Sequence, residues 1–343
     1  MGWIYRNCLR SLLFLQESES AHNRVIMGLS CASRMPFLST LTDAIYGAPD
    51  LPVQFGGLKF PNPIGLAAGM DKHASAVPMW ERLGFGFAEL GGVTRHAQGG
   101  NEAPRMFRAI ADHALVNRMG FNNPGAESVA CTLKEWRARD LWPAHPIGIN
   151  LGKSKITPLK KAAEDYCFTF RELQDLADFF VVNVSSPNTP NLRQLQDKNA
   201  LDEILKTLRE VNSDKALLIK IAPDLTNDAL DDVIDLAINH SLAGIVATNT
   251  TVQNSSAVAV QFQWKRTPDD LKKVRRATGV GGGAFGSSPR AGRSHRRYTC
   301  ACAGRPLPSG TFIAASLSHP SKALAAMLAM PFARLISFNP VQF

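Results

Sequence analysis

Acidic residues are missing from the end of this 343-residue chain, since residues 271–343 include no Asp or Glu. The same stretch holds eleven of the 38 lysines and arginines, which leaves 27 basic against 29 acidic residues before it. The formal net charge of +9 therefore comes from the tail, and the rest of the chain is nearly neutral. Because aromatic residues are not regularly interleaved with the basic residues of the tail, and no binding module is recognisable there, we expect no nucleic-acid partner.

The chain also lacks long apolar runs and a cysteine framework. No run approaches the roughly 18 uninterrupted apolar residues of a membrane-spanning helix, although 45% of the residues are hydrophobic. The six cysteines are scattered, and Cys300-Ala301-Cys302 is one residue too tight for the usual zinc spacing. We therefore expect an intracellular protein without a metal site or a cleavable signal, with room for one barrel of about 250 residues plus extensions.

What the chain does have is a repeated pattern in which a short apolar run ends in polar residues. The run Phe179-Phe180-Val181-Val182 is followed by Asn183-Val184-Ser185-Ser186-Pro187-Asn188-Thr189-Pro190, and other runs end at Lys72, Asn150, Lys220 and Thr248. Taken alone, each such end is equally compatible with an ordinary turn. Their repetition favours a site assembled from successive loops at the carboxyl ends of parallel strands.

The same runs predict six βα units of a barrel. We expect strands near residues 63–68, 87–90, 146–150, 179–183, 217–221 and 244–248, with helical stretches such as 200–211 and 227–239 between them. Asp224 and Thr226 are candidate caps for the helix at 227–239. Residues 53–60 predict two short strands around Gly56-Gly57, which would plug the bottom of the barrel.

Five motifs within residues 51–251 resemble those of a dihydroorotate dehydrogenase of class 2, the membrane-associated and quinone-reducing class. They occur in the order and spacing that the family's βα repeat would give. Ser186 points to this class, because the soluble class has cysteine there. The motifs are Leu66-Ala67-Ala68-Gly69-Met70-Asp71-Lys72, Asn117-Arg118-Met119-Gly120-Phe121-Asn122-Asn123, Ser185-Ser186-Pro187-Asn188-Thr189-Pro190, Lys220-Ile221-Ala222-Pro223-Asp224-Leu225 and Ala247-Thr248-Asn249-Thr250-Thr251.

The resemblance implies a TIM-type (β/α)8 barrel that oxidises dihydroorotate to orotate in pyrimidine (UMP) biosynthesis, with FMN as hydride acceptor and quinone as final electron acceptor. Ser186 would be the catalytic base. Asparagine side chains both donate and accept hydrogen bonds, which suits a ring edge of alternating carbonyl and N–H groups. The implied substrate contacts are Lys72, Asn117, Arg118, Met119, Gly120, Phe121, Asn183, Asn188, Asn249 and Thr250. The implied cofactor contacts are Ala68, Gly69, Lys72, Gly92, Asn150, Asn183, Lys220 and Thr248.

One departure from the family concerns Gly91-Gly92-Val93-Thr94. The family usually carries Ser or Thr at the position of Gly92. The hydroxyl contact is therefore absent, and we expect only the backbone of Gly92 to contact the flavin.

Residues 1–46 predict short amphipathic helices ahead of the barrel, with an apolar stripe flanked by Arg6, Arg10 and Arg24. On amphipathicity alone, a helix packed against the core is about as good an interpretation as one lying on a membrane. The resemblance favours the second, a helical extension that faces membrane quinone from the cytoplasmic side of the cell membrane without spanning it. Residues 47–251 would then form the barrel that holds the FMN and dihydroorotate site.

After Thr251 the βα rhythm stops, and residues 252–343 are rich in Gly, Ser, Arg, Pro and Ala. The family's last two units should carry a Gly-Gly-Leu-Ser-Gly segment and a Gly-Val-Gly-Gly strand end for the flavin phosphate. Gly279-Val280-Gly281-Gly282-Gly283 matches the second superficially, but neither a buried strand nor a helix flanks it. We hypothesise that the chain is translated out of frame from Val252 or Thr278 onward. An incomplete barrel with weak flavin binding and activity would follow.

Two alternatives stay open. The chain could be another flavin-dependent barrel oxidoreductase, such as a dihydropyrimidine or hydroxy-acid oxidoreductase, and tests of orotate binding and quinone reduction would separate these. It could also be the inactive product of a damaged gene that retains the motifs, which the reading frame across residues 251–304 would reveal.

Overall fold

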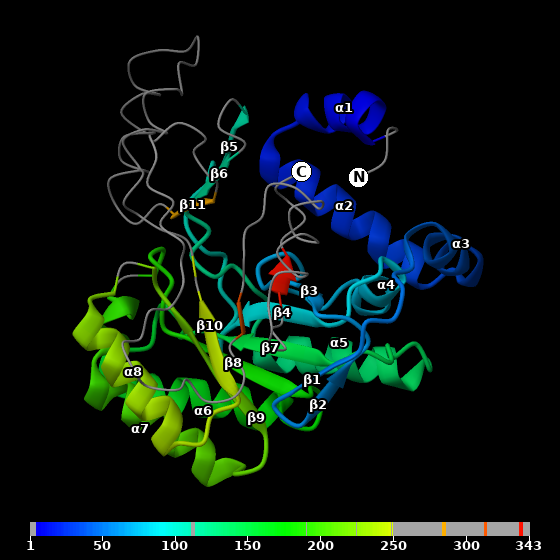
Figure 1. Ribbon diagram of the computed structural model, residues 1–343. Coiled ribbons are helices and arrows are strands. Elements are labelled where there is room, and N and C mark those ends of the chain that lie inside the picture. Colours follow the sequence, from blue (N-terminus) through cyan, green and yellow to red (C-terminus); the bar gives the residue numbers. More distant parts are fainter. Residues whose placement is uncertain are drawn as a thin grey trace, which may run out of the picture.

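The chain begins with helices and continues into a barrel. The structure is a computed structural model that describes residues 5–110, 114–189, 191–223, 225–247 and 249, together with the backbone of 283–285, 312–313 and 336–338. The expected N-terminal helices are present: a π-helical turn at Tyr5–Leu9, then α1 (Arg10–Phe14), α2 (Ser18–Ser33) and α3 (Pro36–Tyr46). In Figure 1 they lie together beside one end of the barrel.

Eight parallel strands close into the predicted TIM-type barrel (Figure 1), in the spatial order β10-β12-β13-β3-β4-β7-β8-β9. All six strands expected from the sequence are present, and β8 has the expected bounds. The eight strands are β3 (Ile64–Leu66), β4 (Ala88–Val93), β7 (Ile147–Leu151), β8 (Phe179–Asn183), β9 (Ala216–Ile221), β10 (Gly244–Ala247), β12 (Phe312–Ile313) and β13 (Ile336–Phe338).

The expectation of an incomplete barrel is wrong at the level of the backbone. The tail supplies two short strands: β12 pairs in parallel with β10, and β13 pairs in parallel with β3. Ladder hydrogen bonds come from the backbone, so short segments that lack a buried-strand pattern can still cover the two open edges of a six-stranded sheet. The segment from Gly279 to Gly283, which matches the family's phosphate loop only superficially, lies mostly outside the described residues. Gly283 itself begins β11 (Gly283–Phe285), which pairs with β6 outside the barrel.

A second sheet lies outside the barrel and was not expected from the sequence. Strands β5 (Met106–Ala109) and β6 (Ala114–Asn117) form an antiparallel hairpin, and β11 adds to its β6 edge. Strand β5 contacts helix α2, so the hairpin links the N-terminal helices to the barrel.

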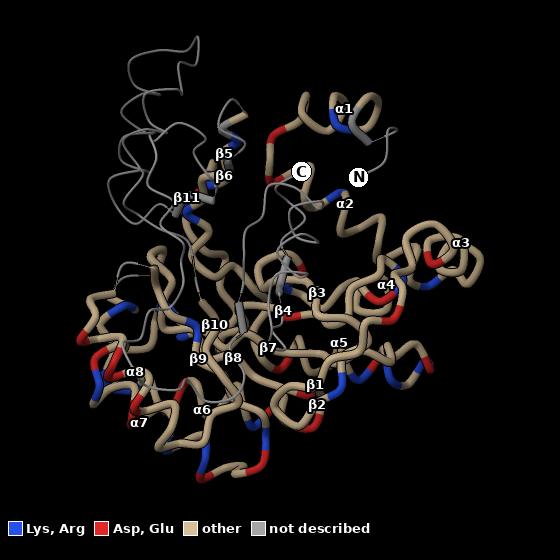
Figure 2. The backbone as a smooth tube through the Cα atoms, viewed as in Figure 1, with Lys and Arg blue, Asp and Glu red and all other residues tan. Residues whose placement is uncertain are grey.

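Alternating side chains along the barrel strands separate two cores. On β8, Phe180 and Val182 belong to the large cluster between strands and helices, whereas Phe179 and Val181 belong to a cluster inside the barrel. The covering helices are α4 (Val77–Arg82), α5 (Ala126–Ala138), α6 (Ala162–Leu173), α7 (Lys198–Val211) and α8 (Asn227–Asn239), as Figure 1 shows. Figure 2 shows most charged residues on these helices and on loops.

Hydrogen bonds from polar side chains fix where two of these helices begin. Thr226 caps α8 as predicted, since its hydroxyl accepts from the N–H of Ala229 at 3.3 Å; Asp224, the other candidate, lies outside the described residues. Asp197 caps α7 by accepting from the N–H groups of Asn199 and Ala200. Such caps satisfy N–H groups that have no partner within the helix.

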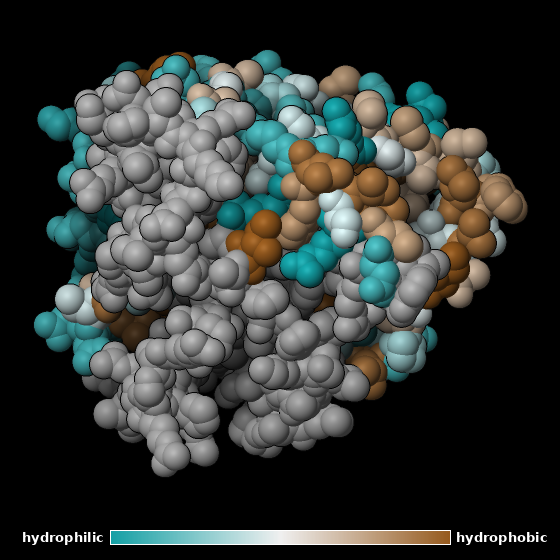
Figure 3. Space-filling view, turned by 90° about the horizontal axis from the view of Figure 1, so that it is seen from above, coloured by the Kyte–Doolittle hydropathy of each residue, from teal (hydrophilic) through white to brown (hydrophobic). Residues whose placement is uncertain are grey.

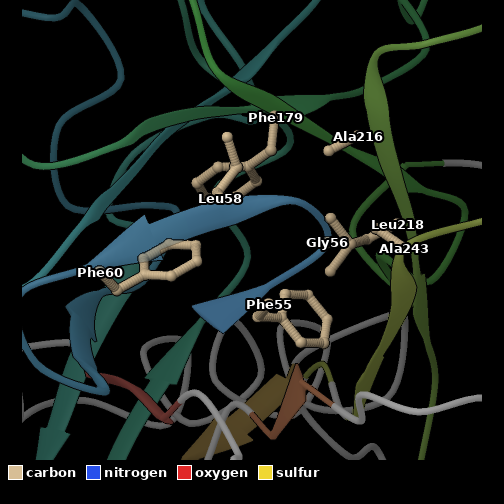
Figure 4. Close-up of a pocket in the computed structure, with 8 residues that line it drawn as sticks. All are labelled: Phe55, Gly56, Leu58, Phe60, Phe179, Ala216, Leu218 and Ala243. Carbon is tan, nitrogen blue, oxygen red and sulfur yellow. The ribbon is translucent and has the colours of Figure 1, made fainter. Parts of the chain in front are cut away.

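The predicted hairpin, β1 (Val53–Phe55) with β2 (Leu58–Phe60), plugs the bottom of the barrel. Phe60 packs edge-on against Phe87 and Phe179 inside it. Figure 4 shows a small pocket left between this hairpin and the strand starts, with only apolar groups or glycine around it. Because it offers no polar side chain, this pocket is a packing defect rather than a site for chemistry.

The N-terminal helices expose many large apolar side chains. Those exposed on α1, α2 and α3 or directly beside them are Leu9, Leu12, Leu15, Met27, Met35, Phe37, Leu41, Ile45 and Tyr46. Figure 3, seen from above, shows hydrophobic residues gathered over this part of the molecule. Within the described part of the chain, no helix combines the length and apolar character needed to cross a bilayer.

Candidate active site

A network of polar side chains lies inside the barrel, near the carboxyl ends of neighbouring strands. Asn150 of β7 donates from Nδ2 to Oε1 of Glu89 on β4 at 2.6 Å, and accepts at Oδ1 from Nδ2 of Asn183 on β8 at 2.8 Å. Lys220 of β9 places Nζ 3.9 Å from Oε1 of Glu89. All four residues are at least nine-tenths buried. The barrel therefore encloses a polar layer above its apolar bottom.

The loop after β8 extends this network toward the mouth. The hydroxyl of Ser185 donates to Oδ1 of Asn183 at 2.9 Å, and Nδ2 of Asn249, after β10, donates to the Ser185 hydroxyl at 3.0 Å. Ser186 is buried beside it, and its Oγ accepts a long 3.4 Å hydrogen bond from the N–H of Asn188. Among the described residues, the hydrogen bond seen at the Ser186 hydroxyl is therefore a weak one, which leaves this group available to contact a ligand.

The β8 loop also meets the hairpin region. Nδ2 of Asn188 donates to Oδ1 of Asn117 at 3.1 Å, and Nδ2 of Asn101 donates to the carbonyls of Arg118 and Asn188. These bonds bring loops from two distant parts of the sequence together. They place the side chains of Asn117 and Asn188 on the same side of the mouth as Ser186.

The loop after β3 supplies a cationic group and a close backbone approach. Nζ of Lys72 donates to Oδ1 of Asn122 at 2.6 Å, and burial lowers the pKa of Lys72 to about 8, with the positive charge of Arg105 adding to the effect. Gly69 has a φ of +102°, which disfavours side chains, and its N–H donates to the carbonyl of Gly91 at 2.6 Å. The β3 loop at Gly69 therefore lies against strand β4 at Gly91.

Gly92 leaves room for an aromatic ring. A Cβ on Gly92 would lie 2.7 Å from the ring of Phe121 and 3.1 Å from Oδ1 of Asn150. In this chain, Phe121 occupies the space that a side chain at position 92 would need. This supports the expectation that only the backbone of Gly92 is available to a ligand.

Helix α2 covers the same end with a charged pair and a half-buried histidine. Arg105 donates to both carboxylate oxygens of Glu19 at 2.6–3.0 Å, and this hydrogen bonding lowers the pKa of Glu19. Burial lowers the pKa of His22 to about 4, the charge of Lys72 adds to the shift, and Glu19 opposes it. His22 is therefore neutral at physiological pH, close to the groups around Lys72.

The structure places most of the sequence-predicted residues together, with clear exceptions. The side chain of Met119 packs with Met106 and Leu115. The guanidinium of Arg118 donates to the carbonyl of Pro104, so neither of these two side chains contacts the polar network through the bonds described. Thr248 and Thr250 lie outside the described residues. The residues seen around the mouth or in the polar layer include Gly69, Lys72, Gly92, Asn117, Phe121, Asn150, Asn183, Ser186, Asn188, Lys220 and Asn249.

Two buried polar residues of this region were not predicted from the sequence. These two are Glu89 and Thr189, and neither Oε2 of Glu89 nor Oγ1 of Thr189 has a hydrogen-bond partner among the described residues. The same is true of Oδ1 of Asn188, a residue that was predicted. For Glu89, an acidic residue within a strand of otherwise apolar and glycine residues was the available signal. Buried polar atoms normally have partners, so these three mark where a ligand could supply them.

The arrangement fits the ring of a flavin. It offers glycine backbone at Gly69 and Gly92, hydrogen-bonded amides at Asn150 and Asn183, and a lysine near the end of β9. The residues that the family would use for the flavin phosphate fall in the part of the chain that the structure leaves undescribed. The fit therefore concerns the ring end of the cofactor.

Comparisons with known proteins agree with this geometry. The model of the dihydroorotate dehydrogenase family, which is flavin-dependent, matches residues 50–285. A relative from Gloeobacter violaceus, named dihydroorotate dehydrogenase (quinone), is 55% identical over 249 residues, covering 72% of this chain and 69% of the relative. A relative of the same name from Thermosynechococcus vestitus is 57% identical and covers 60% of this chain and 55% of its own length. Another from Thermus thermophilus is 50% identical and covers 71% of this chain and 70% of its own length.

Solved structures lead to the same family. The crystal structure of ligand-free DHODH from Eimeria tenella superposes with a TM-score of 0.62 at 32% identity, covering 78% of this chain and 74% of the other. The family match spans more than half of the chain and includes the barrel residues of the site described above, whereas Glu19 and His22 of α2 lie before it. The chain is therefore a member of the dihydroorotate dehydrogenase family.

Proposed function

We propose that this chain oxidises dihydroorotate to orotate in pyrimidine biosynthesis, with FMN as hydride acceptor and a membrane quinone as final electron acceptor. The observation that carries the proposal is the convergence of Ser186, the asparagine network and Lys220 at one end of the barrel. The names of the relatives support the same reaction and acceptor. FMN supplies the hydride-accepting chemistry when bound, and the side chains supply orientation, charge and proton transfer.

Ser186 is the proposed base that removes a proton from a ring carbon of the substrate. Serine is a weak base, so the proton must pass on to a neighbouring group or water. The hydroxyl is buried, and its described hydrogen bond, from the N–H of Asn188, is long. A proton can therefore be accepted at Oγ without first breaking a strong hydrogen bond.

The substrate is a flat ring that carries one carboxylate, and the mouth offers matching groups. Lys72 is the proposed counter-charge for that carboxylate or for the reduced flavin, since its ammonium group is protonated below about pH 8. Asn117, Asn188 and Asn249 are proposed to bind the ring edge through amides that donate and accept. Thr250, Arg118, Met119, Gly120 and Phe121 complete the proposed substrate set.

FMN is proposed to lie over the polar layer. Ala68, Gly69 and Gly92 would let the flavin ring approach the backbone, and Asn150, Asn183 and Thr248 would contact its polar edge. Lys220 would stabilise negative charge near N1 and O2 of the ring, and Lys72 would contribute from the β3 loop.

We propose peripheral contact with the cytoplasmic side of the cell membrane through helices α1 to α3. The apolar side chains exposed there, such as Leu15 and Phe37, would enter the interface while the barrel stays in water. Quinone would reach the site from the membrane along this side. Sedimentation of the full chain with anionic lipid vesicles, compared with a Leu15→Glu/Phe37→Glu variant, tests the contact.

The activity is tested on the purified full chain with added FMN. We expect a bound-flavin absorbance band, bleaching of that band by dihydroorotate, and recovery on addition of a quinone. Ser186→Ala should keep the flavin but lose at least about a hundredfold of the bleaching rate, the contribution typical of a positioned base. A protein that holds flavin but is not reduced by dihydroorotate would favour another flavin oxidoreductase, and one that holds no flavin would favour the damaged-gene alternative.

A further inference from the structure

The barrel contains a carboxylate to which the proposed reaction assigns no task. Glu89 lies on β4 with none of its surface exposed, and its neighbours Ala88 and Leu90 point to the opposite, helix-facing side of the strand. Its side chain lies inside the barrel, one alternation above Phe87 of the apolar bottom. The carboxylate therefore stands between the apolar plug and the proposed flavin-binding layer.

Glu89 is the final acceptor of a directional series of hydrogen bonds. Nδ2 of Asn249 points to Oδ1 of Asn183 at 3.5 Å, Nδ2 of Asn183 donates to Oδ1 of Asn150, and Nδ2 of Asn150 donates to Oε1 of Glu89. An asparagine amide can face either way, but an ionised carboxylate can only accept. Glu89 thereby sets which way the amides of Asn150 and Asn183 face.

The same carboxylate is the nearest described counter-charge of Lys220. Oε1 of Glu89 lies 3.9 Å from Nζ of Lys220, and both side chains are removed from solvent, so their interaction is only weakly screened. An apolar residue in this place would avoid the desolvation of a charge. The second oxygen, Oε2, has no described partner, so packing alone does not account for the residue.

We propose that Glu89 is a positioning residue that tunes the reduction potential of the flavin. It does so by holding the Lys220 ammonium group, by offsetting part of its positive charge, and by fixing the amides of Asn150 and Asn183. This inference rests on the proposed function, because it needs a flavin beside Lys220. It concerns electron transfer and adds no group that touches the substrate.

The sign of the effect follows from the charges. A reduced flavin is more electron-rich than the oxidised form, so a nearby positive charge raises its potential and a nearby negative charge lowers it. Glu89→Gln keeps the shape of the side chain but removes the negative charge, which leaves Lys220 uncompensated. We expect the two-electron reduction equilibrium to shift at least tenfold toward reduced flavin, equivalent to a rise of about 30 mV.

The test is the midpoint potential of the FMN-loaded full chain, measured against a reference dye, together with FMN affinity by fluorescence quenching. Glu89→Gln is expected to raise the potential, and Lys220→Met to lower it. Glu89→Asp retains the charge and should stay within about threefold of the wild-type equilibrium, about 15 mV. Glu135→Gln, an exposed charge removal on α5, is the matched control and should not change the potential.

The outcomes separate this inference from the proposed function. Wild-type protein that takes up no FMN overturns the proposed function and this inference with it. Flavin-loaded Glu89→Gln with an unchanged or lowered potential overturns only the role of Glu89. A tenfold shift of the reduction equilibrium in Glu89→Asp also overturns this role, because the charge is retained in that variant. The same shift in Glu135→Gln overturns it too, because removal of a remote charge would then have the same effect.

Discussion

Lowering the pH from 7 to 5 should destabilise the packing of helix α2 on the barrel through His22. This imidazole lies between α2 and the barrel mouth, where burial and the charge of Lys72 hold its pKa at about 4, while Glu19 partly opposes the shift. Its Nδ1 is buried without a hydrogen-bond partner among the described residues. The folded protein therefore keeps this group neutral where an unfolded chain would protonate it.

The magnitude follows from the difference between the two pKa values. An unfolded histidine titrates near 6.5, so between about pH 6.5 and pH 4 the unfolded state binds more protons than the folded one. Stability is then unaffected above this window and falls by up to about 1.4 kcal/mol per pH unit within it. At pH 5 the loss of unfolding free energy reaches about 2 kcal/mol, which corresponds to about 3 °C in Tm for a chain of 343 residues.

The assay is thermal unfolding at pH 7 and pH 5 of the wild-type chain and of His22→Gln, which cannot titrate in this range. We expect the Tm of the wild type to fall about 3 °C further than that of His22→Gln between the two pH values. Asn23→Gln, on the exposed side of the same helix, is the matched control and should follow the wild type. Equal losses in wild type and His22→Gln would show that His22 is accessible to protons, and would refute the packing described for α2.

Three further predictions concern the mouth of the site. Because the pKa of Lys72 is about 8, orotate affinity should fall up to about tenfold per pH unit above pH 8, and Lys72→Ala should abolish this dependence in a fluorescence titration. Gly92→Ser would bring a side chain against the ring of Phe121, so we expect a lower Tm and weaker FMN binding despite the restored hydroxyl; an unchanged Tm would show that the ring moves aside easily. Glu19→Gln weakens the two-oxygen contact with Arg105 and should destabilise the protein by about 1 kcal/mol in urea unfolding, whereas equal stability would place the pair among inert surface contacts.

The fold was predictable where one local pattern determined the structure. Strand β8 was found at its full length because Phe179 to Val182 are apolar on both faces, as a strand between barrel interior and helices must be. Helix α8 was found from its cap at Thr226. The hairpin of β5 and β6 was missed, since Met106-Phe107-Arg108-Ala109 has no clear period of two. Its neighbours α2 and β11 lie far from it in the sequence.

The site was predictable in its residue types and less so in its electrostatics. The strand-end asparagines, Ser186 and Lys220 stood out because polar groups follow apolar runs. Glu89 did not stand out, because a single acid in a strand reads as a solvent-facing position unless the barrel interior is known. The pKa of His22 depends on α2 lying over the β3 loop, a contact between distant segments that no local pattern encodes.

The unusual tail makes a prediction at the level of single codons. The family's Gly-Gly-Leu-Ser-Gly segment is encoded by GGx-GGx-CTx-TCx-GGx, where x is any base, when its leucine uses a CTx codon and its serine a TCx codon. Read from the third base of the first codon, the same DNA gives xGG, xCT, xTC and xGG. These codons permit Gly283-Ala284-Phe285-Gly286, which is the sequence of this chain.

A single inserted base upstream of Gly283 would produce this reading. The family match ends at Phe285, close to the segment where the reading frame would have changed. Sequencing the gene should then find GGG, GCT, TTC and GGG at positions 283–286, and removal of one upstream base should restore both the Gly-Gly-Leu-Ser-Gly segment and a later Gly-Val-Gly-Gly. Any other alanine codon at 284, or TTT at 285, would exclude the shift, and the tail would then have to be regarded as an evolved replacement that closes the barrel through β12 and β13.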